Sequence, residues 1–111
     1  MEKKVIRPYG QTEIENHAAK VGGERNLREI IIETDDDYEF HYLVKKPGRN
    51  VIQAIADAEK NKDITAQQKV IIGCVLEGDR NAYEHDGAIY SQLLKRIGLL
   101  LESAKGSVKK L

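Results

Sequence analysis

The chain has 111 residues, of which 41% are hydrophobic and 32% are charged, and this composition predicts one soluble domain with a modest, mainly aliphatic core. Eighteen basic and eighteen acidic residues give a formal net charge of zero, so no whole-molecule field attracts nucleic acid or an anionic membrane. One cysteine excludes an internal disulfide, and no apolar run is long enough for a membrane-spanning helix.

The first 26 residues are predicted to form an N-terminal arm that contains one short helix. Residues 1–11 include a proline and a glycine and show no hydrophobic period, which favours irregular structure. This stretch also lacks the apolar segment of a signal peptide, so we expect a cytoplasmic protein. Thr12 and Glu15 have the spacing of a capping box, and Gly22-Gly23 supplies a stop. The helix is expected between these two signals.

Residues 27–111 are predicted to form a single α+β domain that begins with a β-hairpin at about residues 27–46. Apolar residues alternate with polar ones on both sides of three consecutive aspartates. A loop over these aspartates sets two apolar pairs opposite each other on one face, and a slip by one residue would pair apolar with polar. The predicted pairs are Ile32 with Phe40 and Ile30 with Tyr42.

The loop at Asp35–Asp37 contains no glycine. We therefore expect an aspartate, Asp37, to adopt the left-handed conformation that such a loop requires. The same register sets Glu33 opposite Glu39, at a cost of up to about 1 kcal/mol.

Three helices are predicted after Pro47, which ends the second strand because it cannot donate to the sheet. Their ranges are about 49–61, 65–77 and 87–104, and the second begins at a capping box of Thr65 and Gln68. Gly78 is predicted to end the second helix, and Asp79 or Asp86 can cap the next element of the chain.

Cys74 is predicted to lie on the apolar face of the second of these helices, together with Val70 and Ile71. A free cysteine in such a place is a small core residue whose thiol pKa is raised by burial. The three histidines are too widely and irregularly spaced to resemble a zinc site. We therefore predict no catalytic residue, no cofactor and no metal ion.

The last helix is richer in apolar residues than one core-facing stripe requires. One interpretation is a central helix that the other elements surround. The other is a helix that leaves part of its apolar surface free to bind a partner helix or a second copy of the chain. The residues predicted to serve as core and partner surface are Leu94, Ile97, Leu100 and Leu101.

Several segments of residues 38–111 follow one another in a recognisable order. They are a strand running into Lys46-Pro47, a helix carrying Cys74, the acidic turn Glu77-Gly78-Asp79, a long aliphatic helix and the closing Lys109-Lys110-Leu111. In this order they resemble the small tail assembly chaperones of tailed bacteriophages and prophages. That family often has serine or threonine after the proline, whereas this chain has Gly48, which is also an acceptable helix cap. The first 26 residues do not share the resemblance.

The resemblance implies a non-enzymatic protein of the bacterial host cytoplasm. It implies that the protein binds the long, helical tape measure protein until tail-tube subunits replace it. Some members of that family are also made in a longer form by ribosomal frameshifting near the 3′ end of the gene, so the resemblance allows a homo-oligomer or a frameshifted longer form as a further partner.

Two other classes of function stay open. The cluster of Lys45-Lys46 with Arg49, and that of Lys105 with Lys109-Lys110, would suit a small cytoplasmic regulatory or nucleic-acid-binding protein. Acidic neighbours and the neutral net charge count against nucleic acid. An enzyme with a cysteine nucleophile would need an adjacent histidine that the sequence does not place.

Overall fold

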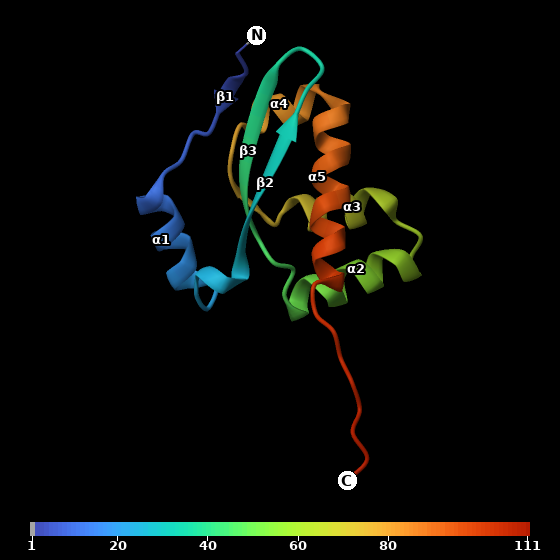
Figure 1. The fold of residues 1–111 in the computed structure, drawn as a ribbon. Helices are drawn as coiled ribbons and strands as arrows, with labels where there is room; N and C mark the ends of the chain where they lie inside the picture. The colour runs from blue at the N-terminus through green and yellow to red at the C-terminus, as the bar shows by residue number, and fades with distance from the viewer. Residues whose placement is uncertain (1) are drawn as a thin grey trace.

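The computed structural model describes residues 2–111, and it has an α+β fold in which helices cover a four-stranded sheet (Figure 1). The strands are β1 (Lys4–Ile6), β2 (Leu27–Glu33), β3 (Tyr38–Lys45) and β4 (Val75–Glu77). The helices are α1 (Gln11–Lys20), α2 (Arg49–Lys60), α3 (Ile64–Ile72), α4 (Arg80–His85) and α5 (Gly87–Leu99), and 3₁₀ turns lie at Glu24–Asn26 and Leu100–Glu102. Beyond the second turn, the last residues run away from the domain without regular structure.

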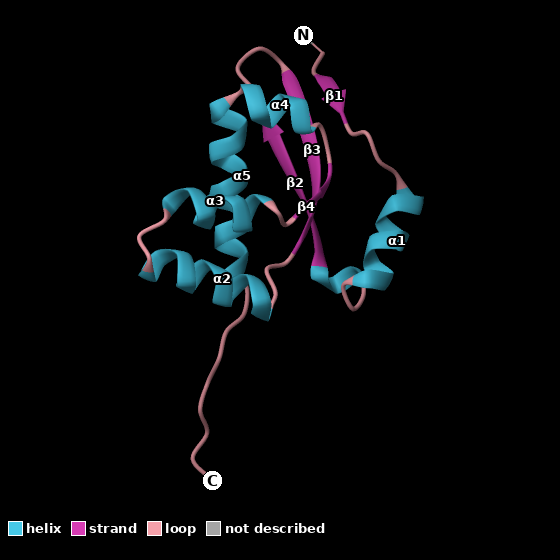
Figure 2. Ribbon diagram, turned by 180° about the vertical axis from the view of Figure 1, so that it is seen from behind, coloured by secondary structure: helices cyan, strands magenta, loops and turns pink. Residues whose placement is uncertain are grey.

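β3 pairs with each of the other strands. β2 runs antiparallel along one of its edges, while β1 and β4 share the opposite edge (Figure 2). β1 pairs in parallel with Tyr38–Phe40, and β4 pairs antiparallel with Leu43 and Val44. Within residues 2–111 no strand pairs with the outer edge of β2, so this strand is the open edge of the sheet.

The predicted hairpin is confirmed in its bounds and register. Ile32 pairs with Phe40, Ile30 with Tyr42 and Glu33 with Glu39. Asp37 has φ 66°, the left-handed conformation expected of a loop without glycine. The period-2 pattern fixes this register because both apolar pairs are buried on one face.

The main core lies between that face of the sheet and α5. Three residues of α5, each four positions apart, are almost completely buried against the strands, as expected for one stripe of a helix. The buried residues are Ile30, Ile32, Phe40, Tyr42, Val44, Cys74, Ile89, Leu93 and Ile97. A smaller cluster of Tyr9, Leu27 and Leu43 lies on the other face, packed against Ile14, Ala18 and Val21 of the α1 region.

The N-terminal arm differs from the prediction of irregular structure over residues 1–11. Residues 4–6 form β1, whose first amide donates to the Asp37 carbonyl at 2.8 Å. α1 begins at Gln11 with Gly10 as its N-cap, and the Glu13 carboxylate accepts from the Gly10 N–H at 3.4 Å. The predicted Thr12–Glu15 capping box is therefore wrong, because the helix begins about half a turn earlier, at a cap formed by Gly10 and Glu13. β1 was missed because its partner strand lies more than 30 residues away in sequence.

The helix predicted at 65–77 is wrong at both ends. It begins at Ile64, because the Asp63 carboxylate caps it by accepting from the Ala66 N–H at 3.0 Å. It ends at Ile72, and Val75–Glu77 form β4 instead. The Cys74 carbonyl accepts from the Lys45 N–H at 2.9 Å, so pairing with β3 overrides the local helical pattern.

The region predicted as one helix at 87–104 is shorter and is preceded by an unpredicted helix. α5 runs only to Leu99 before tightening into a 3₁₀ turn, and α4 precedes it. Both predicted caps are present, since Asp79 accepts from the Ala82 N–H at 3.0 Å and Asp86 from the Ala88 N–H at 2.9 Å. The helix predicted at 49–61 is confirmed, and it spans Arg49–Lys60.

Candidate functional site

The four residues predicted on the last helix do not share one surface. Ile97 is fully buried and belongs to the core, while Leu94 and Leu100 are half-buried and Leu101 is 44% exposed. Leu100 also packs against the core. The richness of this segment in apolar residues is therefore explained mainly by packing, and Leu101 alone of the four offers a large apolar area to solvent.

A groove of about 900 Å³ lies between the end of β2 and the neighbouring side of α5. Its lining is mixed, because apolar side chains lie among a larger number of polar and charged ones. The lining residues of β2 and the following turn are Ile31, Ile32, Glu33, Thr34 and Asp35, and those from Asp86 onward are Asp86, Ala88, Ile89, Ser91, Gln92 and Arg96.

The open edge of β2 borders this groove. The Thr34 N–H donates to the Tyr38 carbonyl at 2.9 Å, so the even-numbered residues of β2 bond to β3. The N–H and C=O groups of Glu29, Ile31 and Glu33 consequently point away from the sheet. Ile31 is 53% exposed, so an apolar side chain lies among unpaired backbone groups.

Ile31 was not among the predicted site residues, although the sequence carries a signal for it. Ile30, Ile31 and Ile32 are consecutive, and a strand with one buried face has room for only the first and third of them. The middle isoleucine therefore had to point to the other side of the sheet. An apolar residue at a position where the alternating pattern calls for a polar one indicates a surface that binds another molecule.

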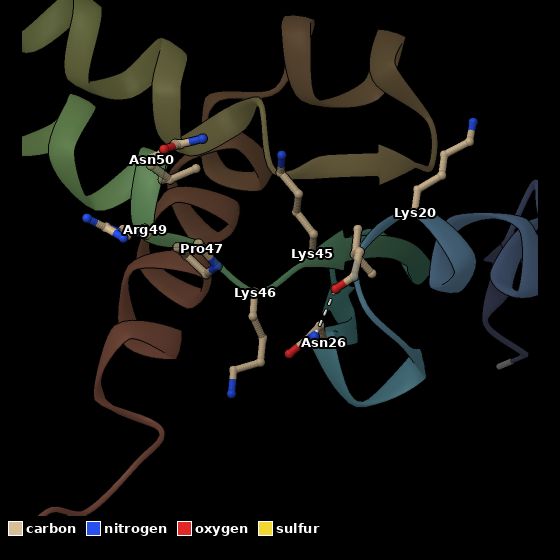
Figure 3. A pocket seen from close by; sticks show the side chains of 10 residues that line it. Lys20, Asn26, Lys45, Lys46, Pro47, Arg49 and Asn50 are labelled. Atoms are coloured by element: carbon tan, nitrogen blue, oxygen red, sulfur yellow. Dashed lines mark hydrogen bonds between the residues drawn. The ribbon is translucent and has the colours of Figure 1, made fainter.

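A second hollow, of about 510 Å³, lies where α1, β3 and α2 meet (Figure 3). It is lined by basic and amide side chains and by the backbone at the start of α2, and no acidic residue lines it. The residues are Lys20, Val21, Asn26, Lys45, Lys46, Pro47, Gly48, Arg49, Asn50 and Val51. Lys20 was not among the basic clusters noted in the sequence, because only the fold brings the end of α1 close to β3.

Cys74 is completely buried and lies in the turn between α3 and β4. Burial raises the pKa of its thiol, and the charge of Lys45 lowers this pKa by a smaller amount. The predicted helical position is wrong, but the predicted role as a core residue is consistent with this burial. At neutral pH the thiol stays protonated, which makes it a poor nucleophile.

A thiol reagent should therefore label native Cys74 at least about 100-fold more slowly than the unfolded chain, because labelling requires local opening. Stopped-flow reaction with a chromogenic disulfide, with and without denaturant, measures both rates. Labelling of the native protein at the rate of the unfolded chain would contradict the burial of the sulfur.

The three histidines lie apart from one another. Two of them, His17 and His41, each lie beside a carboxylate. His17 Nε2 is 3.1 Å from Glu77 Oε1, and His41 Nε2 is 2.7 Å from Glu39 Oε2. The described part of the chain contains no group of three or more histidine, cysteine or acidic residues that could hold a metal ion. The first pair joins α1 to β4, and the second joins two positions of β3. Both pairs therefore have a structural role.

Comparison with known proteins gives no further guide to the site. No family model, curated protein or solved structure matches the chain. Among residues 2–111, no helix combines the length and the apolar character needed to cross a membrane. The assignment of function therefore depends on the groove between β2 and α5, the hollow where α1, β3 and α2 meet, and the open edge of β2.

Proposed function

We propose that this chain is a non-enzymatic, chaperone-like protein that binds a segment of a partner protein in the groove between β2 and α5. The observation that carries the proposal is the open edge of β2, where half-exposed Ile31 lies beside the groove. An unpaired strand edge that carries an exposed isoleucine is a surface that proteins usually cover. A bound segment would provide that cover.

The resemblance to tail assembly chaperones supplies the identity that we propose for the partner, which is the helical tape measure protein in the bacterial cytoplasm before the tail tube polymerises. A helix lying along α5 would place apolar side chains at i, i+3 and i+4 against Ala88, and the segment would reach Ile31 by passing over the open edge of β2 to its other face. Leu99, which is 46% exposed, follows Ala88 and Gln92 on the same stripe of α5 and would extend the contact.

The charges of β2 favour a different protein over a second copy at this edge. Two β2 strands paired antiparallel about Ile31 would set Glu29 of each copy opposite Glu33 of the other. Like charges directly opposite each other destabilise a strand pair. A homo-oligomer or an assembly with a frameshifted longer form would accordingly use another surface.

The experiment that tests the proposal compares two strand residues of equal exposure. Ile31 is 53% exposed beside the groove, and Val5 is 54% exposed on β1. We expect Ile31→Glu to weaken binding of helical tape measure fragments about tenfold, as loss of a central apolar contact does, and Val5→Glu to leave it unchanged. Isothermal titration calorimetry measures both affinities, and the fragments are taken from the long helical protein encoded next to the gene.

Equal effects of the two substitutions would contradict the assignment to the groove. A gene neighbourhood without a long helical protein and a tail-tube protein would contradict the proposed partner. Because both side chains are more than half exposed, neither substitution is expected to unfold the domain.

A further inference from the structure

The basic hollow at the meeting of α1, β3 and α2 carries positive charge that no acidic residue of its own lining balances. Four cationic side chains line it, from three separate segments: Lys20, Lys45, Lys46 and Arg49. No acidic side chain is among the lining residues. The ion pairs found in residues 2–111 lie elsewhere and include none of these four cations. The hollow is therefore a local positive patch on a chain whose net charge is zero.

The amide groups in the hollow add neutral donors. The side chain of Asn26 donates to the Val21 carbonyl at 2.8 Å, which fixes one wall of the hollow (Figure 3). The side chain of Asn50 makes no hydrogen bond within the described residues and is free to donate to a ligand. Cations with amide donors, and no carboxylate, form a surface suited to phosphate oxygens.

The directions in which the four cationic side chains point indicate a ligand with several phosphate groups and not a single phosphate. In Figure 3 Lys45 and Lys20 extend to one side of the chain, Lys46 extends to the opposite side, and Arg49 points in a third direction. Side chains that converge would hold one phosphate group, whereas side chains that diverge can contact successive phosphates of a flexible chain. No aromatic side chain lines the hollow, so stacking on bases does not contribute there.

We propose that this hollow binds the phosphodiester backbone of single-stranded nucleic acid, without preference for base sequence. A single strand can bend into a concave surface, while a stiff duplex would touch only its rim. The affinity would be modest and strongly dependent on salt, because displacement of counterions supplies most of it. This site is separate from the β2–α5 groove, and the two share no lining residue.

The test uses fluorescence anisotropy of a labelled 12-nucleotide DNA of mixed sequence at 50 to 300 mM salt. Two double variants remove the same charge: Lys46→Ala with Arg49→Ala in the hollow, and Lys69→Ala with Lys95→Ala on exposed turns of α3 and α5. We expect the hollow variant to weaken binding at least about tenfold at low salt, with the control variant changed less than about twofold. Each phosphate contact adds about 0.7 to the magnitude of the slope of log K against log salt. The hollow variant removes two cations, so the magnitude of its slope should be about 1.4 smaller.

Four outcomes would overturn the inference. They are absence of binding by the unsubstituted protein at 50 mM salt, equal weakening in both variants, competition by pyrophosphate as effective as that of the oligonucleotide at equal phosphate concentration, and tighter binding of a duplex of the same length. Thermal unfolding of each variant verifies that the fold is retained. Ile31→Glu should leave oligonucleotide binding intact, which separates this result from the test of the groove.

Discussion

Replacement of Gly78 by alanine is expected to lower the free energy of unfolding by about 4 kcal/mol. Gly78 has φ +137°, a conformation that side chains rarely adopt, and strain of this kind costs about 1 to 3 kcal/mol. An added Cβ would also overlap the Tyr42 ring, 2.8 Å from Cε1 and closer still to Cδ1. The ring cannot move aside, because Tyr42 is fully buried and its hydroxyl donates to the Asp79 carbonyl at 2.8 Å. Overpacking adds about 1 to 3 kcal/mol.

Gly23→Ala is the matched control for this substitution. Gly23 has φ +115°, but an added Cβ would meet no atom within 4 Å. It should therefore suffer the strain without the overlap and lose about 1 to 2 kcal/mol. Urea unfolding of the two variants measures the difference, and equal losses would show that Tyr42 does not pack tightly on Gly78. A small domain has about 5 to 15 kcal/mol of stability, so Gly78→Ala would remove a large part of it.

Replacement of Ile97 by alanine is expected to cost about 3 kcal/mol of unfolding free energy. Ile97 is completely buried between α5 and the sheet, and truncation of such a side chain loses burial and leaves a cavity. Leu101→Ala, at a position 44% exposed, should change stability by less than about 1 kcal/mol. Thermal or urea unfolding separates the two, and a loss at Leu101 as large as that at Ile97 would show that the 3₁₀ turn after α5 packs more closely than its exposure indicates.

The parts of the fold that depend on local signals could be predicted from the sequence. The hairpin register follows from the alternation of apolar residues, and the left-handed Asp37 follows from a loop without glycine. The cap at Asp86 follows from the chemistry of its side chain at a helix start.

The parts that depend on distant partners could not. Val75 has neighbours that fit a helix, but it lies opposite Val44 in the sheet, and this pairing decides its conformation. β1 contains three residues with no pattern of their own, and only the free edge of β3 makes them a strand. The candidate sites follow the same division, because Ile31 had a signal in the three consecutive isoleucines, while the approach of Lys20 to Lys45 exists only in the folded chain.

The arrangement of the sheet around β3 has a consequence for local motion. β1 and β4 are each three residues long and occupy separate stretches of the same edge of β3, so either strand can detach without breaking the pairing between β2 and β3. Amide hydrogen exchange should accordingly be slowest along β3 and faster in the two short strands, which open as separate units. The N-terminal residues can then exchange between docked and free states while the β2–β3 hairpin and α5 stay folded.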